Sequence, residues 1–460
     1  MRSATPLPTW HWVGGLALAL GITLASACRK APPDGVALIG ATLVDGTGGP
    51  VLPDAAIVVR DGRIESVSTG GGFALPPRTV EVNLRGRWII PGLIDAHAHV
   101  ARWALPRYLA WGVTTVRDLH GQLDSSLALR ERVNLGSITG PRIYSAGAMI
   151  DGLPTTYPGA IGANRGPDAR KGVDLLVRRG VDLVKVYTRV DPTLLKATLD
   201  EARTFNLRVT GHLGLTDAVT AANEGISSIE HLSGVPEAAL ADASSLFAAH
   251  YRGFFPGWTA FERSWAGLDS SALERVAREL ARLQVTMVPT LILHKTFSRL
   301  DDPAMLHDSM LGAVPAVELE RWNVPDMVAR AGWTESDFPM FRRGRPAQAL
   351  FLRLFAEVGG RIAAGTDASN QLLIPGYSEH QEMALLVDAG LTPGDALVAA
   401  TRNGALLLGV DSIGIIAPGK VADLVILTRD PLDDIHNTLA IDGVMTRGRL
   451  LSADSVRATW

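Results

Sequence analysis

Trp88-Ile-Ile-Pro-Gly-Leu-Ile-Asp-Ala-His-Ala-His99 is the stretch of sequence that decides the fold class. It is almost continuously apolar and ends in two histidines, as expected of a strand buried in a parallel sheet. Seven more apolar runs follow, separated by helix-length stretches such as Asp191–Phe205. Eight successive βα units predict an α/β fold with one (β/α)8 TIM barrel. The runs are Trp88–His99, Val113–Asp118, Arg142–Met149, Val181–Tyr187, Arg208–His212, Ser228–His231, Thr286–Leu293 and Arg361–Asp367.

Segments rich in β-forming residues flank the predicted barrel on both sides. Short apolar pieces such as Ala37–Val44 alternate with Gly, Asp and Pro turns, and a similar pattern returns in Ala422–Leu427. We therefore expect residues 36–90 and 414–460 to form one small composite β-sandwich domain. The barrel would then occupy residues 91–413, and residues 28–35 would be a linker.

The segment between His231 and Asp367 is longer than two βα units of a barrel require. We therefore expect insertions after the sixth and seventh strands, in loops that overhang the active face. These insertions are dense in aromatic residues that are candidates for an apolar pocket wall. They are Phe254, Phe255, Trp258, Phe261, Trp265, Trp322 and Trp333.

Composition excludes several kinds of site. The 460 residues include 44 Lys and Arg against 47 Asp and Glu, which gives a net charge of -3 and argues against a nucleic-acid partner. Cys28 is the one cysteine of the chain. An intramolecular disulfide, a cysteine-ligated zinc ion and an iron–sulfur cluster are therefore all excluded.

The N-terminus has the pattern of an export signal. The run Val13–Ala27 is apolar or small throughout, too short to span a bilayer but of the length of a secretory signal. The small residues before Cys28 resemble a bacterial lipoprotein cleavage box, so residues 1–27 would be removed and Cys28 lipidated. Arg29 and Lys30 stand where such lipoproteins carry an aspartate for inner-membrane retention, which favours the outer membrane. An ordinary signal or a fixed membrane anchor is the alternative.

Candidate metal ligands lie at the carboxyl ends of the predicted strands, where barrel enzymes place their catalytic groups. His97 and His99 are two residues apart, so on a strand both side chains point to the same side, as two ligands of one ion require. The full set is His97, His99, His212, His231 and Asp367.

Lys185 is a sixth candidate because it lies inside the apolar run Val181–Tyr187. A buried ammonium is costly unless it is paired or chemically altered. Next to two divalent cations its neutral form would react with carbon dioxide, and the resulting carbamate would bridge both ions. The alternative is a structural lysine whose ammonium reaches the mouth of the barrel.

Five short motifs together resemble the amidohydrolase superfamily, in its imidazolonepropionase-like and prolidase-like branch. The motifs are Pro91–His99, Val184-Lys-Val186, Gly211-His212, Ile229-Glu-His231 and Gly365-Thr-Asp367. The resemblance implies that His97, His99 and Asp367 bind one divalent ion, with zinc as the default.

In the same resemblance, His212 and His231 bind a second ion and carbamylated Lys185 bridges the two. A metal-bridging hydroxide would attack a carbonyl carbon, and Asp367 would carry the proton to the amine leaving group. The implied reaction is hydrolysis of an amide or peptide C–N bond.

The substrate is less well defined by the sequence. Tyr187 matches a tyrosine that prolidase-like members use near the substrate, and it would steady the oxyanion. His294, at the end of the predicted seventh strand, is a second substrate-binding candidate. A dipeptide or N-acyl amino acid would also need a cation for its carboxylate, for which Arg165 and Arg189 are candidates.

Three functions follow from these observations. The first is hydrolysis of a dipeptide or an N-acyl amino acid by a binuclear site. The second is hydrolysis or deamination of a cyclic amide, resembling imidazolonepropionase. The third is a non-catalytic, metal-binding surface lipoprotein. A homo-oligomer is compatible with each of them.

Overall fold

A computed structural model describes residues 34–71 and 75–458 of the chain. The predicted signal segment and Cys28 lie outside these residues. Within the described ranges, no helix is both long enough and apolar enough to cross a membrane.

Eight parallel strands form the barrel and confirm the predicted fold class. Neighbouring strands pair in parallel, and Asp182 N, just before the fourth strand, donates to Ser145 O of the third at 3.0 Å. The ring closes where Ala96 N donates to Ala364 O at 2.9 Å. The strands are β6 (Leu93–Ala98), β7 (Val113–Asp118), β8 (Arg142–Ser145), β11 (Val184–Val186), β12 (Val209–Gly211), β13 (Ser228–Glu230), β14 (Thr286–Val288) and β15 (Arg361–Ile362).

The quoted stretch Trp88–His99 is not one strand, which corrects the first predicted run. β5 (Trp88–Pro91) belongs to the terminal sheet and β6 to the barrel, and Gly92 separates them. The Thr114 side chain occupies the space that a Cβ at position 92 would need, so this crossing between two sheets requires glycine. The apolar run is continuous because both strands are buried.

Helices cover the barrel and bury their apolar faces against it. In α9, Leu273, Val276, Ala277 and Leu280 follow the helical repeat and are fully buried, and the Asp269 carboxylate caps the helix. The helices outside the insertions are α1 (Leu105–Ala110), α2 (Leu123–Asn134), α3 (Gly166–Arg179), α4 (Pro192–Thr204), α5 (Ala218–Asn223), α9 (Ser270–Arg282), α13 (Asp337–Glu357), α14 (Tyr377–Asp388), α15 (Pro393–Val398) and α16 (Gly404–Leu408).

Additional helices follow the sixth and seventh strands, as the length of this segment predicts. After β13 come α6 (Val235–Ala239), α7 (Ser244–Arg252) and α8 (Phe254–Ser264). After β14 come α10 (Leu291–Phe297), α11 (Ala316–Trp322) and α12 (Val324–Ala331). The predicted run Thr286–Leu293 therefore contains a short strand and the start of a helix. Two further short strands, β9 (Ile150–Gly152) and β10 (Ile161–Ala163), extend the barrel sheet after β8.

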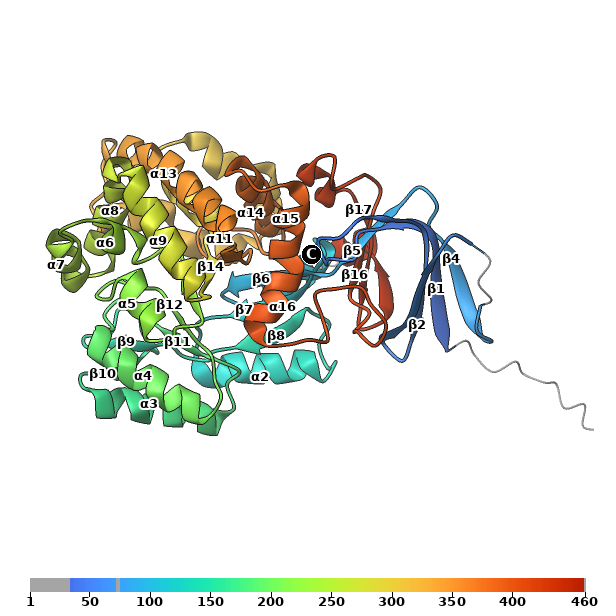
Figure 1. The fold of residues 1–460 in the computed structure, drawn as a ribbon, viewed down its shortest axis with the longest axis horizontal. Helices are drawn as coiled ribbons and strands as arrows, with labels where there is room; N and C mark the ends of the chain where they lie inside the picture. The colour runs from blue at the N-terminus through green and yellow to red at the C-terminus, as the bar shows by residue number, and fades with distance from the viewer. Residues whose placement is uncertain (1–33, 72–74, 459–460) are drawn as a thin grey trace, which may run out of the picture.

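Both chain ends contribute to a separate sheet beside the barrel (Figure 1). β5 pairs in parallel with β1 and antiparallel with β16, so it joins the N-terminal strands to the C-terminal ones. The strands of this sheet are β1 (Gly35–Leu43), β2 (Leu52–Arg60), β3 (Arg63–Thr69), β4 (Thr79–Asn83), β5, β16 (Leu424–Leu427), β17 (Ile441–Thr446) and β18 (Arg449–Ser452). The short helix α17 (Ala453–Arg457) follows them.

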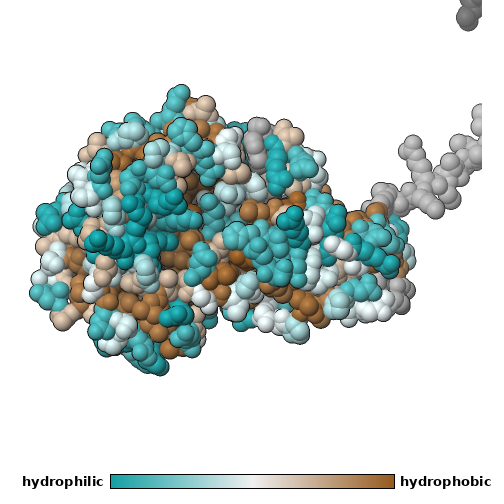
Figure 2. Space-filling view, turned by 90° about the horizontal axis from the view of Figure 1, so that it is seen from above, coloured by the Kyte–Doolittle hydropathy of each residue, from teal (hydrophilic) through white to brown (hydrophobic). Residues whose placement is uncertain are grey.

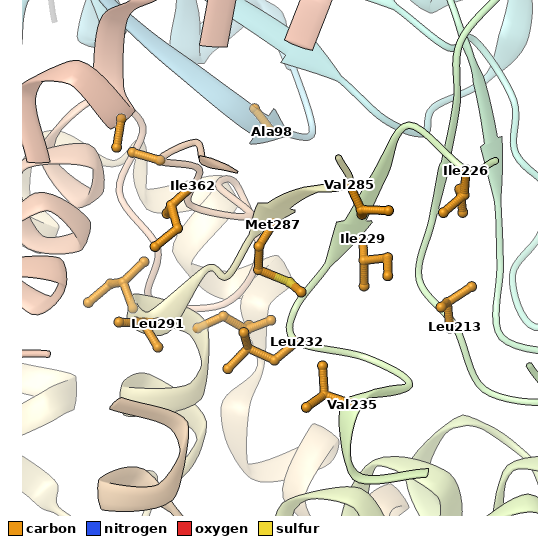
Figure 3. Packing of buried hydrophobic residues seen from close by; sticks show 14 of the residues in the cluster. Ala98, Leu213, Ile226, Ile229, Leu232, Val235, Val285, Met287, Leu291 and Ile362 are labelled. Atoms are coloured by element: carbon orange, nitrogen blue, oxygen red, sulfur yellow. The ribbon is translucent and has the colours of Figure 1, made fainter. Parts of the chain in front are cut away.

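Strand residues alternate between a polar barrel interior and an apolar exterior. Ile229, Met287 and Ile362 pack with Leu291 of α10 in one buried cluster (Figure 3). Their neighbours Ser228 and Glu230 are also buried, and Arg117 of β7 donates a hydrogen bond to each of them inside the barrel. Hydrophilic and hydrophobic residues are interspersed on the face seen in Figure 2.

Candidate functional site

A cluster of histidines and one aspartate lies at the carboxyl end of the barrel. Asp367 Oδ1 is 3.0 Å from His97 Nε2 and 2.9 Å from His99 Nε2. The candidate ligand atoms of these three residues all lie within 4.8 Å of one another. The structure therefore brings together the three groups proposed for the first ion.

The second pair of histidines adjoins this triad. The His231 ring centroid is 4.4 Å from that of His97 and 4.6 Å from that of His212. Burial lowers the pKa of His212 and of His231, so both imidazoles are neutral and each has a ring nitrogen with a free lone pair. His231 Nδ1 lies 2.7 Å from Thr290 Oγ1, which leaves Nε2 as the candidate ligand atom of this residue.

Two of these residues adopt an uncommon backbone conformation. His231 has φ 60° and Asp367 has φ 64°, the left-handed region that non-glycine residues seldom adopt. On a regular strand, His231 would point away from the interior because its neighbour Glu230 points into it. Because of the left-handed φ at His231, the side chains of Glu230 and His231 both contact His97.

Lys185 lies in β11, lines the same cavity as the candidate ligands and is 2% exposed. Among the described residues, its Nζ has no hydrogen-bond partner. Burial lowers the pKa of Lys185 to about 8, so a substantial fraction of its amine is neutral near physiological pH. A buried amine without a partner is the feature that a carbamate or a neighbouring ion would satisfy.

Glu230 supports the site, although its motif Ile229-Glu-His231 drew attention only to the histidine. Its Oε2 is 2.7 Å from His97 Nδ1, and its Oε1 accepts from Arg117 Nη2 at 2.8 Å and from Ser228 Oγ at 2.9 Å. Burial alone would raise the pKa of Glu230, but the Arg117 guanidinium, the hydrogen bond with His97 and the charge of Lys185 together hold this pKa below its usual range. The carboxylate therefore accepts the Nδ1 proton of His97 and directs Nε2 toward Asp367.

Asp95 connects the end of the first barrel strand to the segment that follows the eighth. Its Oδ1 accepts from the backbone N–H groups of His97 and Thr366, each at 3.1 Å, and its Oδ2 accepts from Thr366 Oγ1 at 2.6 Å. Asn370 Nδ2 donates to Asp367 Oδ2 at 2.7 Å. These bonds hold His97 and Asp367 in register with each other.

A cavity of about 640 Å³ opens above the cluster. Lys185, Tyr187 and Arg189 line it from the fourth barrel strand and the loop that follows. Burial raises the pKa of Tyr187 well above its ordinary value, so its hydroxyl keeps the proton. Phe254, Phe255 and Trp258 of the predicted aromatic set also line the cavity, whereas Phe261, Trp265, Trp322 and Trp333 are buried in apolar clusters.

His294 does not have the predicted role. It lies inside α10 rather than at a strand end, is fully buried and does not line the cavity. Its Nδ1 is 2.5 Å from Glu262 Oε1, its Nε2 is 3.1 Å from the His231 carbonyl oxygen, and its ring stacks on Trp258. His294 therefore braces the chain at His231 and cannot reach a substrate.

Arg165 also lies away from the site. It precedes α3, its side chain is 76% exposed, and it faces Asp168 at 3.8 Å. Of the two arginines predicted to meet a substrate carboxylate, Arg189 lines the cavity and Arg165 does not. Arg330 of α12, which sequence reasoning missed, lines it as well.

Comparison with known proteins places this geometry in a family. Residues 88–451 match the model of the amidohydrolase family. The chain belongs to the amidohydrolase family. It is therefore an enzyme that acts on C–N bonds, and the non-catalytic lipoprotein hypothesis is set aside. Family membership also implies a divalent metal, for which His97, His99 and Asp367 form a suitable group.

Three relatives describe the branch. Ochratoxinase from Aspergillus niger is 24% identical over 491 residues, which cover 90% of this chain and 86% of the relative. Imidazolonepropionase from Cereibacter sphaeroides is 28% identical over 403 residues, which cover 84% and 91%. The crystal structure of a Xaa-Pro dipeptidase with methionine bound in its active site superposes with a TM-score of 0.67 at 20% identity, covering 91% of this chain and 100% of the other. This last likeness establishes the fold.

Proposed function

We propose that this amidohydrolase cleaves the amide or peptide bond of a dipeptide or an N-acyl amino acid, with two divalent ions at the barrel mouth. The observation that carries the proposal is the buried Lys185 amine, which has no hydrogen-bond partner in the described part of the chain and lies in one cavity with both candidate ligand groups. The first group is His97, His99 and Asp367, and the second is His212 and His231.

The residues present fit such a centre. Imidazole nitrogens and a carboxylate oxygen suit zinc and other first-row ions. The lowered pKa values of His212 and His231 keep their lone pairs available, and Lys185 as a carbamate would supply further oxygen donors. When bound, the ions would supply a water that is acidic enough to act as hydroxide near neutral pH and would polarise the substrate carbonyl.

The chain's own residues would carry the proton and the oxyanion. Asp367 is ionised, because its contacts with His97 and His99 hold its pKa well below the usual range against the effect of burial. It would accept the proton of the attacking water and return it to the amine nitrogen as the C–N bond breaks. Tyr187 keeps its proton and would donate a hydrogen bond to the carbonyl oxygen as that atom gains negative charge.

Hydrolysis of a cyclic amide or deamination by one ion is the second candidate, and the imidazolonepropionase relative favours it. A mononuclear site would leave Lys185 without a role. A buried amine without a partner costs stability, so a protein with a mononuclear site would gain from an apolar residue at this position. The buried Lys185 amine therefore favours the binuclear proposal.

The experiment is an assay of the metal-loaded protein against dipeptides, N-acyl amino acids and lactams. We expect hydrolysis of the first two classes and loss of at least about 1000-fold in kcat for Asp367→Asn, since the amide cannot accept the proton. Equilibrium dialysis should find that this variant still binds metal. Hydrolysis of lactams alone would overturn the proposal in favour of the second candidate.

A further inference from the structure

Apart from the candidate metal ligands, the charged side chains that line the cavity are positive. Two guanidinium groups line it, those of Arg189 and Arg330. Asp367 is the one carboxylate among the described residues that line it, and it belongs to the candidate metal group. A substrate with a negative charge away from its scissile bond matches this arrangement.

The two arginines are in different states. Arg330 is 62% exposed, and its Nε donates to Asp326 Oδ2 at 2.7 Å, so its charge is already paired and hydrated. Arg189 is half-buried, and within the described residues its backbone N–H makes a hydrogen bond but its guanidinium makes no hydrogen bond or ion pair. An incoming carboxylate would compensate the partial burial of Arg189, whereas Arg330 needs no such partner.

The backbone at Arg189 is held in place by a buried carboxylate. Asp151 is fully buried, and its Oδ1 accepts from Arg189 N at 3.0 Å while its Oδ2 accepts from Thr156 N at 2.7 Å. Gly152 packs against the Arg189 carbonyl oxygen, where any Cβ would collide. The loop that carries Arg189 is thus tied to the 154–158 loop, which also lines the cavity.

An aromatic wall, formed by Phe254, Phe255 and Trp258 of α8, lines the same cavity. The Phe254 ring is stacked on Tyr187 at 6.4 Å and reaches the edge of His212 at 6.0 Å. Thr188, the neighbour of Arg189, shares a small internal cavity with Phe254 and Trp258. The wall thus adjoins Tyr187, and Tyr187 lines the same cavity as Arg189, two residues further along the chain.

We propose that Arg189 binds the α-carboxylate of the substrate and that the aromatic wall receives the side chain of the same residue. Building on the proposed function, this assigns the substrate class as N-acyl amino acids or dipeptides whose carboxyl-terminal residue is bulky and apolar. A cavity of about 640 Å³ also leaves room for a large acyl group.

The test compares N-acetyl-L-phenylalanine with N-acetyl-L-phenylalaninamide, which lacks the carboxylate. For the wild-type, metal-loaded protein we expect kcat/KM for release of the amino-acid product to be roughly 10- to 150-fold higher for the acid than for the amide. Arg189→Met should reduce this ratio to near one by slowing the acid alone, and Arg189→Lys should restore part of it. Arg330→Met is the matched control and should keep the wild-type ratio.

Two results would overturn the assignment of Arg189. An equal loss for acid and amide in Arg189→Met would mean that the residue is structural, and loss of the ratio in Arg330→Met would transfer the role to α12. A second comparison with N-acetylglycine tests the wall: Phe254→Ala should lower the preference for phenylalanine over glycine, and an unchanged preference would refute it.

Calorimetric binding of the same compounds separates this inference from the proposed function. If the wild-type protein hydrolyses neither compound, the proposed function fails, but the binding comparison still decides the role of Arg189. Tighter binding of the acid that disappears in Arg189→Met supports the inference, and equal binding of acid and amide overturns it.

Discussion

Glu230 accepts a hydrogen bond from His97, with 2.7 Å between Oε2 and Nδ1, and Arg117 neutralises the same carboxylate from the other side. The pair fixes the ring of His97 so that its Nε2 faces Asp367. A carboxylate that orients a histidine ligand commonly strengthens metal binding. Glu230 is therefore a positioning residue for the proposed first ion.

Glu230→Gln should lower metal affinity by roughly 10- to 100-fold, because the neutral amide holds the His97 proton less strongly and leaves Arg117 without its counter-charge. Competition with a chromophoric chelator measures the affinity. Glu237→Gln is the matched control, since Glu237 is another buried carboxylate but pairs with His250 at 2.9 Å. Equal losses in the two variants would argue against a specific role for Glu230.

Lys185→Met should reduce bound metal from two ions to one and slow hydrolysis by at least about 100-fold, because the bridging oxygens are lost. A short carboxylic acid should restore part of the activity by placing oxygen donors in the vacated space. Protein loaded in ¹³C-bicarbonate should give a carbamate NMR signal that Lys185→Met lacks and Lys196→Met, at an exposed lysine, retains. Full activity of Lys185→Met with one ion bound would favour the mononuclear candidate.

Buried carboxyl groups behind the site predict how stability depends on pH. Burial raises the pKa of Glu379 well above its ordinary 4.5 and that of Glu382 to about 8. Above the ordinary pKa of 4.5 and up to the raised pKa, each of these carboxyl groups keeps its proton in the native protein but loses it in the unfolded chain. The free energy of unfolding therefore falls as pH rises through this range. Glu379→Gln, which mimics the protonated form, should raise the Tm of the metal-free protein near pH 9 by roughly 1–3 °C. A fall in Tm with pH as steep as that of wild type would exclude Glu379 as a cause.

We propose, from the sequence around Cys28, that a lipid on this residue tethers the enzyme to the outer membrane. Cys28→Ser should move the protein from the membrane pellet to the soluble fraction without changing its specific activity, because residue 28 precedes the described domains. Metabolic labelling with a radioactive fatty acid should mark the wild type only. If Cys28→Ser stays in the pellet, a fixed membrane anchor would replace the lipid.

Periodicity explains why so much of the barrel was predictable. His97 and His99 share one face because strand residues alternate, and parallel strands gather their carboxyl ends at one rim, so widely separated residues such as His212 and Asp367 were predicted to meet. The apolar runs mark buried strands even where only three residues form the ladder, as in Thr286–Val288.

The sequence-based predictions fail where the backbone conformation changes without a change in the hydrophobic pattern. The run Thr286–Leu293 stays apolar while the backbone changes from strand to helix, so His294 was assigned to the wrong element. Glu230 was missed because strand alternation puts it opposite His231, and the left-handed φ that brings both inward leaves no mark in the sequence. Arg330 was missed because its contact with the cavity depends on how an inserted helix folds back.

Metal titration of chelator-stripped protein tests the central claim most directly. The measured quantity is the rate of N-acetyl-L-phenylalanine hydrolysis as a function of zinc equivalents per chain, with bicarbonate present. A binuclear amidohydrolase predicts negligible activity in the stripped protein and a rise that reaches its plateau at two equivalents. Full activity in the stripped protein, or a plateau at one equivalent, would contradict it.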